Sequence, residues 1–309
     1  MAAMDRVLVA GATGMLGGVV ARKLLAAGVP VRALGRNHER LDALAAAGAE
    51  ISATDLLDAP AVARACEGIG QIFSTANNVM GAGSSSPMRV DVRAYRNLCA
   101  AAKAAGVRRI VHCSARDIGP DSPVDYFRVK HQVDEVIRQS GLPYVLIRPV
   151  AFMDIWIDGI LAEGIRKNGT AILFGDGTRR SCYIAVDDVA EFAVRILARE
   201  DVRNEEVDVG GPSTVSYLEL VSLLERSMGV PVKRKHVPTF MLHYVPLVIR
   251  PFNELAARLM RLGYFSALRD RVFPEWQASA ERFGVSPGTV EAFVQERYGK
   301  GSQGAPRAV

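Results

Sequence analysis

The sequence has few residues suited to disulfide or metal chemistry. Only four of its 309 residues are cysteines, and no two of them form a C-x-x-C pair. Such scattered thiols predict neither a disulfide framework nor a zinc site, and they fit the reducing cytosol best. The five histidines also lack the spacing that places two ligands on one helical face. We therefore expect no metal. The cysteines are Cys66, Cys99, Cys113 and Cys182.

Long hydrophobic runs are also missing. The most lipophilic stretch, residues 240–249, is too short and too interrupted to span a bilayer. Residues 1–6 contain no long apolar segment ahead of the first expected strand, so secretion is not expected. We expect a cytoplasmic protein without a membrane span. The sequence leaves open whether it is a monomer or a dimer.

Charge of one sign is nowhere concentrated. The formal net charge is +5, and the densest basic cluster is Lys233–His236. This cluster is typical of a solvated strand or loop rather than of a nucleic-acid contact. No nucleic-acid partner is expected, because an anionic cofactor or small-molecule substrate is a sufficient partner for the charge.

What the sequence does contain is a regular α/β pattern. A composition of 49% hydrophobic and 23% charged residues predicts a globular chain with a large core, in one large domain or two unequal lobes. Short β-rich runs alternate with helical stretches up to Pro149, which predicts a doubly wound parallel sheet of the Rossmann type. The expected strands are 6–10, 29–34, 50–54, 71–75, 109–114 and 144–149. The expected helices are 14–27, 38–47, 60–66, 90–105 and 125–140.

A glycine-rich turn follows the first of these strands. Gly11, Gly14 and Gly17 stand between an apolar strand and a helix, the context of a dinucleotide-binding turn. Gly11 would allow the tight turn, Gly14 would admit a pyrophosphate at the helix N-terminus, and Gly17 would let the helix lie close to the sheet. An ordinary strand-to-helix turn is the alternative. Thr13, Met15 and Leu16 complete the expected cofactor-binding loop.

A basic residue follows the second strand, where an NAD site would have an acidic one. A carboxylate at this point binds the ribose 2′-hydroxyl of NAD, whereas an arginine accommodates the 2′-phosphate of NADP. The chain has Arg36 here and Arg40 four residues later, so both guanidinium groups can face one phosphate. We predict NADP(H) rather than NAD(H) as the cofactor. A solvated basic turn is the alternative.

After Pro149 the alternation breaks. We expect residues 1–150 to form the NADP-binding domain, with 187–212 returning to it, and a smaller α+β substrate lobe from 151–186 and 213–298. The tail, 299–309, has little that could pack and is expected to be disordered. In the second half the expected helices are 152–166, 187–198, 216–228 and a region broken by prolines at 240–262. The expected strands are 171–174, 182–186, 206–209 and 232–236.

Candidate catalytic residues follow the fifth strand. Ligands bind beyond the carboxyl ends of the strands in such sheets, which points to Ser114 and to the helix after it. Tyr126 and Lys130 are four residues apart, so they share one helical face. The Lys130 ammonium would favour the Tyr126 phenolate and could bind the nicotinamide ribose, while Ser114 would orient a substrate carbonyl. An exposed Y-x-x-x-K pair with a half-buried ring is the alternative.

Five segments together resemble a known family, namely 10–17, 106–114, 126–130, 141–149 and 183–190. Over roughly the first 230 residues the chain is similar to the NmrA-like branch of atypical short-chain dehydrogenases/reductases. The resemblance implies a Rossmann domain with a small C-terminal substrate lobe. It also implies that Arg36 takes the NADP phosphate, that Asp55 lies near the adenine, and that Asn77 and Ser114 line the cofactor channel.

In that family the lysine matching Lys130 is the more regular catalytic element, and the tyrosine matching Tyr126 is often missing. Here both are present, which favours a reductase. Some members, however, are thought to bind NAD(P) without turnover. Lys130 and Pro149 are also expected to contact the cofactor.

Five apolar residues after the sixth strand are candidates for the substrate pocket. They would suit an apolar or aromatic substrate, and a place in the core between the lobes is the alternative for each. The five are Phe152, Met153, Trp156, Phe174 and Tyr183. The leading hypothesis is an NADPH-dependent reductase of a carbonyl, enone or quinone-like substrate, with Tyr126 and Lys130 as the proton relay. The second hypothesis is a non-catalytic NADP(H)-binding redox sensor or regulatory protein.

Overall fold

The computed structural model describes residues 5–299, which divide into two compact units. Unit 1 contains the chain up to Arg148 together with Val189–Asp208, and unit 2 contains Pro149–Asp188 and the chain from Val209 onward. From the sequence we placed the corresponding boundaries after residues 150, 186 and 212. The expected disordered tail lies outside the described residues, apart from Gly299.

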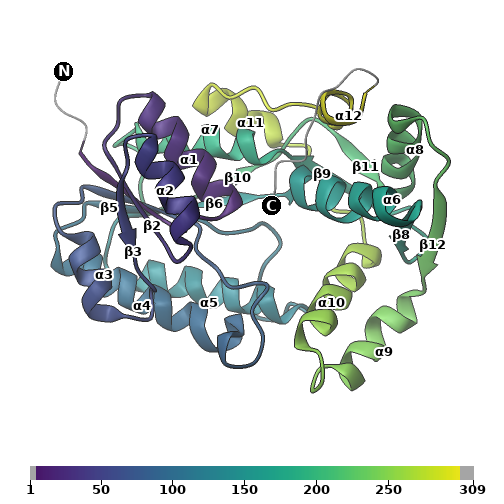
Figure 1. Cartoon of the computed structure of the whole chain (residues 1–309), viewed down its shortest axis with the longest axis horizontal. Coiled ribbons are helices and arrows are strands. Elements are labelled where there is room, and N and C mark those ends of the chain that lie inside the picture. Colours follow the sequence, from purple (N-terminus) through teal and green to yellow (C-terminus); the bar gives the residue numbers. More distant parts are fainter. Residues whose placement is uncertain (1–4, 300–309) are drawn as a thin grey trace. The chain divides into compact units, whose positions relative to one another are not determined.

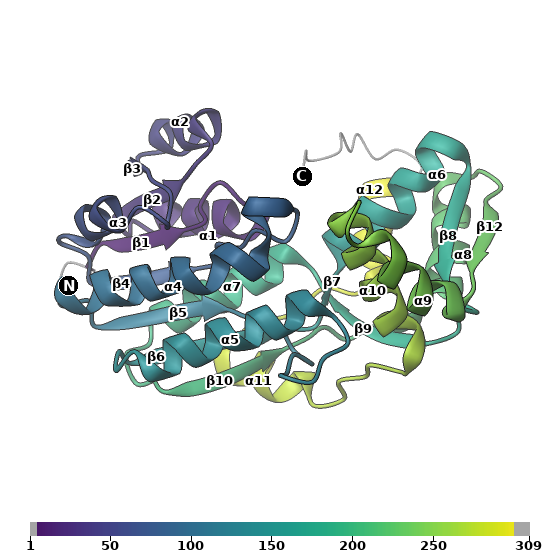
Figure 2. The ribbon, with the colours of Figure 1, turned by 90° about the horizontal axis from the view of Figure 1, so that it is seen from below.

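Unit 1 is built on a seven-stranded sheet with the order β10-β6-β5-β4-β1-β2-β3. The neighbours from β6 to β3 pair in parallel. Figure 1 shows α3, α4 and α5 along one face of this sheet and α1 and α7 along the other, and Figure 2 shows α4 and α5 in front of the strands with α1 and α7 behind them. The predicted doubly wound Rossmann fold is therefore confirmed. The strands are β1 (Val7–Ala10), β2 (Val31–Gly35), β3 (Glu50–Ala53), β4 (Gln71–Ser74), β5 (Arg109–Cys113), β6 (Tyr144–Pro149) and β10 (Glu205–Val209).

The helices of unit 1 begin and end at recognisable signals. Asn37 and Asp58 cap α2 and α3 with their side chains, and proline opens α4. Gly28 and Gly106 take positive φ values just beyond α1 and α4, where a left-handed residue ends a helix. The helices are α1 (Met15–Ala26), α2 (His38–Ala46), α3 (Ala59–Cys66), α4 (Pro87–Ala104), α5 (Asp125–Gln139) and α7 (Val186–Leu197).

The central strands of unit 1 are buried along their whole length. Every residue of β1, β2, β4 and β5 is buried, as expected for a parallel sheet covered by helices on both faces. Their apolar residues form the core together with α4, through residues such as Leu8, Ile72, Ile110 and Leu98. The edge strand β3 is mostly exposed.

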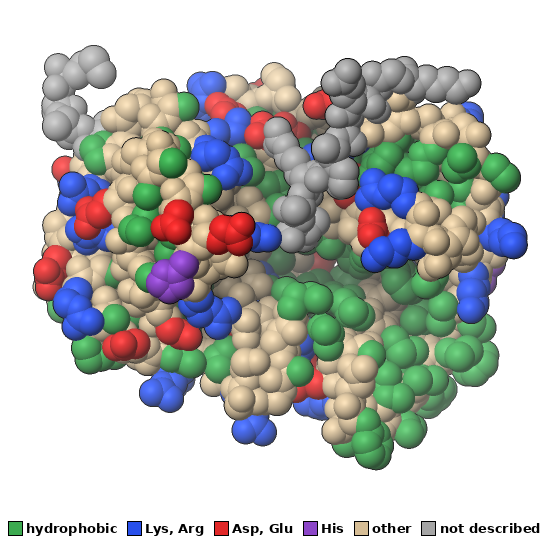
Figure 3. All heavy atoms as spheres, viewed as in Figure 1, with side chains coloured by type: hydrophobic (Ala, Val, Ile, Leu, Met, Phe, Trp, Pro, Cys, Tyr) green, Lys and Arg blue, Asp and Glu red, His purple; other side chains and the backbone are tan. Residues whose placement is uncertain are grey.

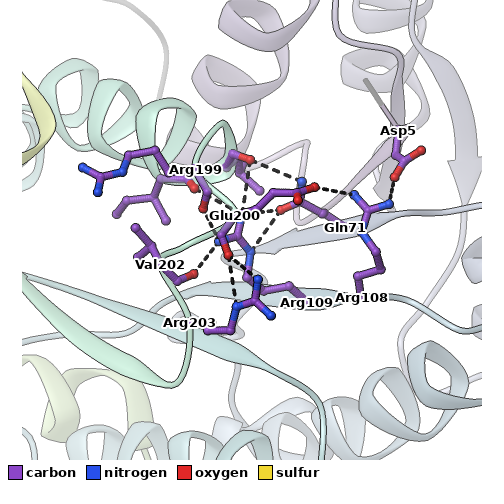
Figure 4. A network of polar contacts seen from close by, with 10 residues as sticks. Asp5, Gln71, Arg108, Arg109, Arg199, Glu200, Val202 and Arg203 are labelled. Atoms are coloured by element: carbon purple, nitrogen blue, oxygen red, sulfur yellow. Dashed lines mark hydrogen bonds and ion pairs between the residues drawn. The ribbon is translucent and has the colours of Figure 1, made fainter. Parts of the chain in front are cut away.

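A buried arginine fixes the edge of the sheet where the strands begin (Figure 4). Arg109, at the start of β5, is only 4% exposed, and its guanidinium donates to Gln71 Oε1 on β4 at 3.1 Å. It also donates to the carbonyl oxygens of Ile196, Leu197 and Arg199, at the end of α7 and just beyond it. These bonds satisfy the buried cation and tie the returning segment to the sheet. The site described below lies at the carboxyl ends of the strands.

Unit 2 contains two small sheets and a π-helix. The first sheet has the order β11-β9-β7, and the second pairs β12 with β8 in parallel. Its strands are β7 (Ala151–Phe152), β8 (Thr170–Phe174), β9 (Arg180–Ile184), β11 (Thr214–Ser216) and β12 (Lys233–Val237). The prediction of one helix over 152–166 is wrong at its start: Phe152 pairs with Ile184 of β9, a π-helix covers Asp154–Ala162, and α6 follows at Glu163–Asn168.

The remaining helices of unit 2 surround a second core. They are α8 (Tyr217–Met228), α9 (Thr239–Ile249), α10 (Glu254–Leu268), α11 (Trp276–Phe283) and α12 (Val290–Tyr298). The expected break in the region 240–262 lies around Pro251, whereas Pro246 stays inside α9 and the second helix continues to Leu268. α10 packs closely on β8, since a Cβ on Gly263 would lie 2.6 Å from the Phe174 ring. The sequence did not predict α11 or α12.

Candidate functional site

The glycine turn between β1 and α1 has room for backbone but not for side chains. Gly11 has a φ of +91°, and a Cβ there would lie 2.8 Å from the backbone nitrogen of Ala76. A Cβ on Gly17 would lie 2.1 Å from the Gly11 carbonyl oxygen, so the helix can approach the turn only with glycine at this position. Gly11 and Gly17 thus have the conformational roles expected of them.

The N-terminus of α1 carries no side-chain cap. Its N-cap residue is Gly14, and its first turn contains no acidic residue. The first N–H groups of a helix have no intrahelical partners and attract anions. The end of α1 is therefore suited to a phosphate.

Two arginines lie where β2 ends, and they contact different partners. Arg40 Nη1 donates to the Thr13 carbonyl oxygen at 2.9 Å, which holds the glycine turn. Arg36 Nη2 donates to Asn78 Oδ1 at 3.2 Å, and its Nη1 lies 3.8 Å from Asp55 Oδ2. The side chain of Arg36 is 61% exposed, so it can reach a ligand phosphate. Arg36 and Asp55, both expected at the cofactor, therefore lie close together.

Asn78, the neighbour of the predicted Asn77, contacts Arg36. The Asn77 side chain donates to the Thr75 carbonyl oxygen and accepts from the backbone N–H of Val79, so it stabilises its own turn. Nothing in the spacing of these two neighbouring asparagines distinguished them in the sequence. The amide of Asn78 also donates to the Ser85 carbonyl oxygen, which fixes the loop after β4.

A buried polar cluster lies between β5 and α5. Residues 126, 130 and 134 follow one another at four-residue intervals, so Tyr126, Lys130 and Asp134 share one face of α5, and all three are buried. His112 and Ser114 lie two residues apart at the end of β5, so they point to the same face of the sheet. Ser114 Oγ donates to Asp134 Oδ2 at 2.6 Å, and Lys130 Nζ donates to the Cys113 carbonyl oxygen at 3.3 Å.

The hydroxyl of Ser114 therefore differs from its predicted orientation. Its residue is 3% exposed, and its proton is held by Asp134 rather than offered to a substrate carbonyl. Asp134 was not among the predicted site residues, although its position four residues after Lys130 was a readable signal. The ammonium of Lys130 lies 5.8 Å from the centre of the Tyr126 ring, so the predicted pair does come together.

Burial and charge shift the pKa values of Asp134 and Lys130 in opposite directions, and that of His112 in the same direction. Burial raises the pKa of the Asp134 carboxyl, although the Ser114 hydrogen bond and the Lys130 charge partly offset the shift. Burial lowers the pKa of the Lys130 ammonium, but the nearby Tyr126, Cys113 and Asp134 outweigh it, and the net shift is upward. The pKa of His112 is well below its ordinary value, because of burial and the charge of Lys130.

His112 is held as a neutral ring with a defined tautomer. Its Nδ1 lies 3.1 Å from the Ser74 carbonyl oxygen, which can only accept, so Nδ1 carries the proton. Nε2 then presents a lone pair towards Asp134 Oδ1 at 3.8 Å, and both atoms lack a hydrogen-bond partner in residues 5–299. The two facing atoms thus lie beyond hydrogen-bond distance.

The five residues predicted to line a substrate pocket fall into two groups. Met153 and Tyr183 are 0% and 1% exposed, so they belong to the core of unit 2 and not to a pocket surface. Trp156 and Phe174 are half-buried and form an edge-to-face triad with Tyr217, with ring centres 5.7–6.4 Å apart. Phe152 is also half-buried, in β7. Pro149, predicted to contact the cofactor, is the buried last residue of β6.

Two further properties of the described residues concern metal binding and membrane-spanning helices. Within residues 5–299, no group of histidine, cysteine, aspartate and glutamate side chains is arranged to hold a metal ion. None of the helices in the same range is long and apolar enough to cross a membrane.

Comparison with known proteins places the glycine turn in a family. A family model described as NAD(P)H-binding matches residues 11–200. An NAD(P)H azoreductase of Xenophilus azovorans is 30% identical over 228 residues, which cover 74% of this chain and 75% of the relative. The photosystem II assembly factor Ycf39 of a Synechocystis strain is 26% identical over 300 residues, or 96% of this chain and 91% of the relative.

The solved structures share the fold. An NADPH-dependent quinone oxidoreductase of Escherichia coli, complexed with NADPH, superposes with a TM-score of 0.77. The match covers 94% of this chain and 99% of the other at 21% identity. With a Rossmann sheet, a glycine turn at an uncapped helix and a family match across more than half its length, this chain belongs to the NAD(P)H-binding family, as its resemblance to the NmrA-like reductases implied.

Proposed function

We propose that the protein is an NADPH-dependent reductase of a small apolar or aromatic carbonyl, enone or quinone-like substrate. The observation that carries this proposal is the placement of Lys130 and Tyr126. A buried ammonium and a buried phenol lie side by side on α5, next to the end of β5 in a sheet that belongs to an NAD(P)H-binding family. The names of the azoreductase and the quinone oxidoreductase support reduction of a conjugated acceptor.

The residues around the glycine turn fit a dinucleotide with a 2′-phosphate. Gly11, Gly14 and Gly17 would bring backbone N–H groups to the pyrophosphate, with Thr13, Met15 and Leu16 completing the loop. Arg36, supported by Arg40, would bind the 2′-phosphate, because its guanidinium is exposed and shares only a long ion pair with Asp55. Bound NADPH would supply the hydride.

The chain's own contribution to the reaction is a proton. As a hydride reaches the acceptor, the Tyr126 hydroxyl gives its proton to the developing oxyanion, and the Lys130 ammonium stabilises the phenolate left behind. Solvent then returns a proton to Tyr126. The pKa of Lys130 is shifted upward from its ordinary value, which favours the charged ammonium.

Ser114 and Asp134 would act as positioning residues in this scheme. The short hydrogen bond from Ser114 to Asp134 orders the end of β5, whose carbonyl oxygen at Cys113 holds Lys130. For unit 2 we propose the substrate-binding role, with the half-buried rings of Phe152, Trp156 and Phe174 as the candidate contacts.

The test is single-turnover oxidation of bound NADPH, followed by its nicotinamide absorbance, against aromatic ketones, enones and quinones. We expect at least one class to be reduced, and Tyr126→Phe to slow that turnover roughly 10²–10⁴-fold while leaving NADPH affinity nearly unchanged. Gln132→Ala, an exposed residue of the same helix, is the matched control and should keep the parent rate. Full turnover in Tyr126→Phe would reject the relay, and no oxidation across the panel would reject the enzyme.

A second candidate is a non-catalytic NADP(H)-binding protein that reports cofactor state to a partner. What favours it is the match to an assembly factor along 96% of this chain. The two candidates differ in one measurement: a sensor would bind a partner protein differently with NADP and with NADPH, and it would oxidise no acceptor.

A further inference from the structure

The α9–α10 region of unit 2 presents an unusual apolar surface. Phe240, Tyr244, Leu247 and Val248 occupy one face of α9 and are all exposed, and Phe252 follows in the turn to α10. Val248 is 70% exposed and Phe252 is 90% exposed. Figure 3 shows a broad hydrophobic area at the lower right, where Figure 1 places α9 and α10. We call these five residues the α9 patch.

The α9 patch is not the inner side of the helix. Leu242 and Pro246, four residues apart on the opposite face, are buried and provide the packing of α9 within unit 2. A helix that is apolar on both its inward and its outward face needs a second apolar environment. Patches of large exposed side chains mark binding surfaces for proteins or membranes.

The sequence that contains the α9 patch is rich in cations and poor in carboxylates. Between residues 226 and 269 the sequence contains a single carboxylate, Glu254, and it pairs with the buried Arg258. Four exposed cations lie before, at the end of and after the two helices in sequence: Lys233 and Lys235 on β12, Arg250 at the C-cap of α9, and Arg269 after α10. None of the four has a carboxylate partner in the part of the chain that the structure describes.

We propose that the α9 patch docks the protein on the surface of an anionic lipid bilayer. With 11 residues, α9 is too short to span the hydrocarbon core and suits a helix that lies in the interface plane. Its aromatic and aliphatic side chains would enter the boundary between headgroups and acyl chains, while the flanking lysines and arginines contact acidic headgroups. A second copy of this chain fits less well, because the same cations would face each other across a two-fold interface.

The test is flotation of the full chain with phosphatidylcholine vesicles that contain phosphatidylglycerol. We expect the chain to float with these vesicles, to float less with pure phosphatidylcholine, and to dissociate as salt is raised. Replacing Phe240, Val248 and Phe252 together by serine should lower the bound fraction at least about tenfold, because three large side chains no longer enter the lipid. Arg250→Glu should weaken binding to the anionic vesicles alone.

The matched control is Ile172→Ser combined with Ile51→Ser, two exposed apolar residues outside the α9 patch, which should leave flotation unchanged. Thermal unfolding of each variant verifies that it is folded. Parent chain that stays unbound on anionic vesicles at low salt would overturn the proposal, as would equal flotation of the triple variant. Sedimentation that shows a dimer, abolished by the triple variant and without any flotation, would assign the patch to a second copy instead.

Discussion

The charged groups at the two ends of the candidate site differ in solvent exposure: those at one end are exposed, and those at the other are buried. At the Arg36 end, the guanidinium and the Asp55 carboxylate are 61% and 47% exposed and lie 3.8 Å apart. At the Lys130 end, Lys130 and Asp134 are 9% and 1% exposed, and each is hydrogen-bonded to β5 or to the residue directly after it. An exposed pair contributes little to stability, so Arg36 can exchange its partner for a ligand phosphate. A buried charge must keep its partners, so the Lys130 end is built in advance of any ligand.

The largest effect on turnover is expected from a substitution of Lys130 at the buried end. Lys130→Met removes the ammonium that stabilises a Tyr126 phenolate, so turnover of a suitable acceptor should fall roughly 10²–10⁴-fold. NADPH should also bind more weakly, because the cation is lost from the ribose. Rapid-mixing absorbance gives the rate and calorimetry gives the affinity. Lys103→Met, on the exposed surface of α4, is the control, and parent-like turnover in Lys130→Met would place the proton source elsewhere.

At the exposed end, a single substitution should change cofactor choice without changing the fold. Arg36→Ala should cost about 1.5–3 kcal/mol of NADPH binding, the range for hydrogen bonds to charged groups, and little of NADH binding. Titration calorimetry of both cofactors measures the difference. Arg64→Ala, an exposed arginine of α3, should change neither affinity. Equal affinity of the parent for NADPH and NADH would contradict a 2′-phosphate site at Arg36.

The glycine turn lies near the exposed Arg36 end, yet its backbone atoms are closely packed. Gly17→Ala should lower the free energy of unfolding by about 2 kcal/mol, because the new methyl group overlaps the Gly11 carbonyl oxygen and the helix must shift. Denaturant titration measures this loss. In Gly119→Ala the added methyl group meets no atom within 4 Å, so that variant should match the parent. Equal stability of both variants would mean that the turn is more adaptable than the contact suggests.

The smallest expected effect is on the pH dependence of the free energy of unfolding, and it tests whether His112 is neutral in the folded protein. The folded-state pKa of His112 is far below its ordinary 6.5, so unfolding in acid takes up a proton and stability is lost as pH falls below that value. One such group accounts for about 1.4 kcal/mol between about pH 7.5 and about pH 5.5. His112→Asn, whose amide can still donate to Ser74, should not lose this part of its stability when the pH is lowered. Denaturant titrations at both pH values compare the two proteins, and parallel losses would indicate a charged His112 in the fold.

Local sequence signals were enough for unit 1. Each predicted strand up to Pro149 lies within two residues of the observed one, because continuous apolar runs and glycine stops are short-range features. The glycines of the turn could be assigned for the same reason. The contact of Asn78 with Arg36 could not be predicted, because it depends on how the loop after β4 folds back to Ser85.

Unit 2 was harder because its pairings join distant segments. Phe152 continues the helical pattern of the residues after it, yet it pairs with Ile184 more than thirty residues away. Met153 and Tyr183 are residue types common in apolar pockets, but both are fully buried in the core. An apolar side chain alone does not distinguish a pocket position from a core position. The interval from Lys130 to Asp134 was visible, but its meaning depended on Ser114 reaching the same helical face.

The cluster between β5 and α5 combines two repeat lengths, and this restricts how the chain can change length. His112 and Ser114 alternate with a period of two, while Tyr126, Lys130 and Asp134 recur at intervals of four. One residue inserted into either run would turn every later member of that run away from the cluster at once. The segment 115–124 between the runs obeys neither period. We expect natural or engineered insertions to be tolerated there, whereas a single deletion inside 112–114 or 126–134 turns the later members of that run away from the cluster.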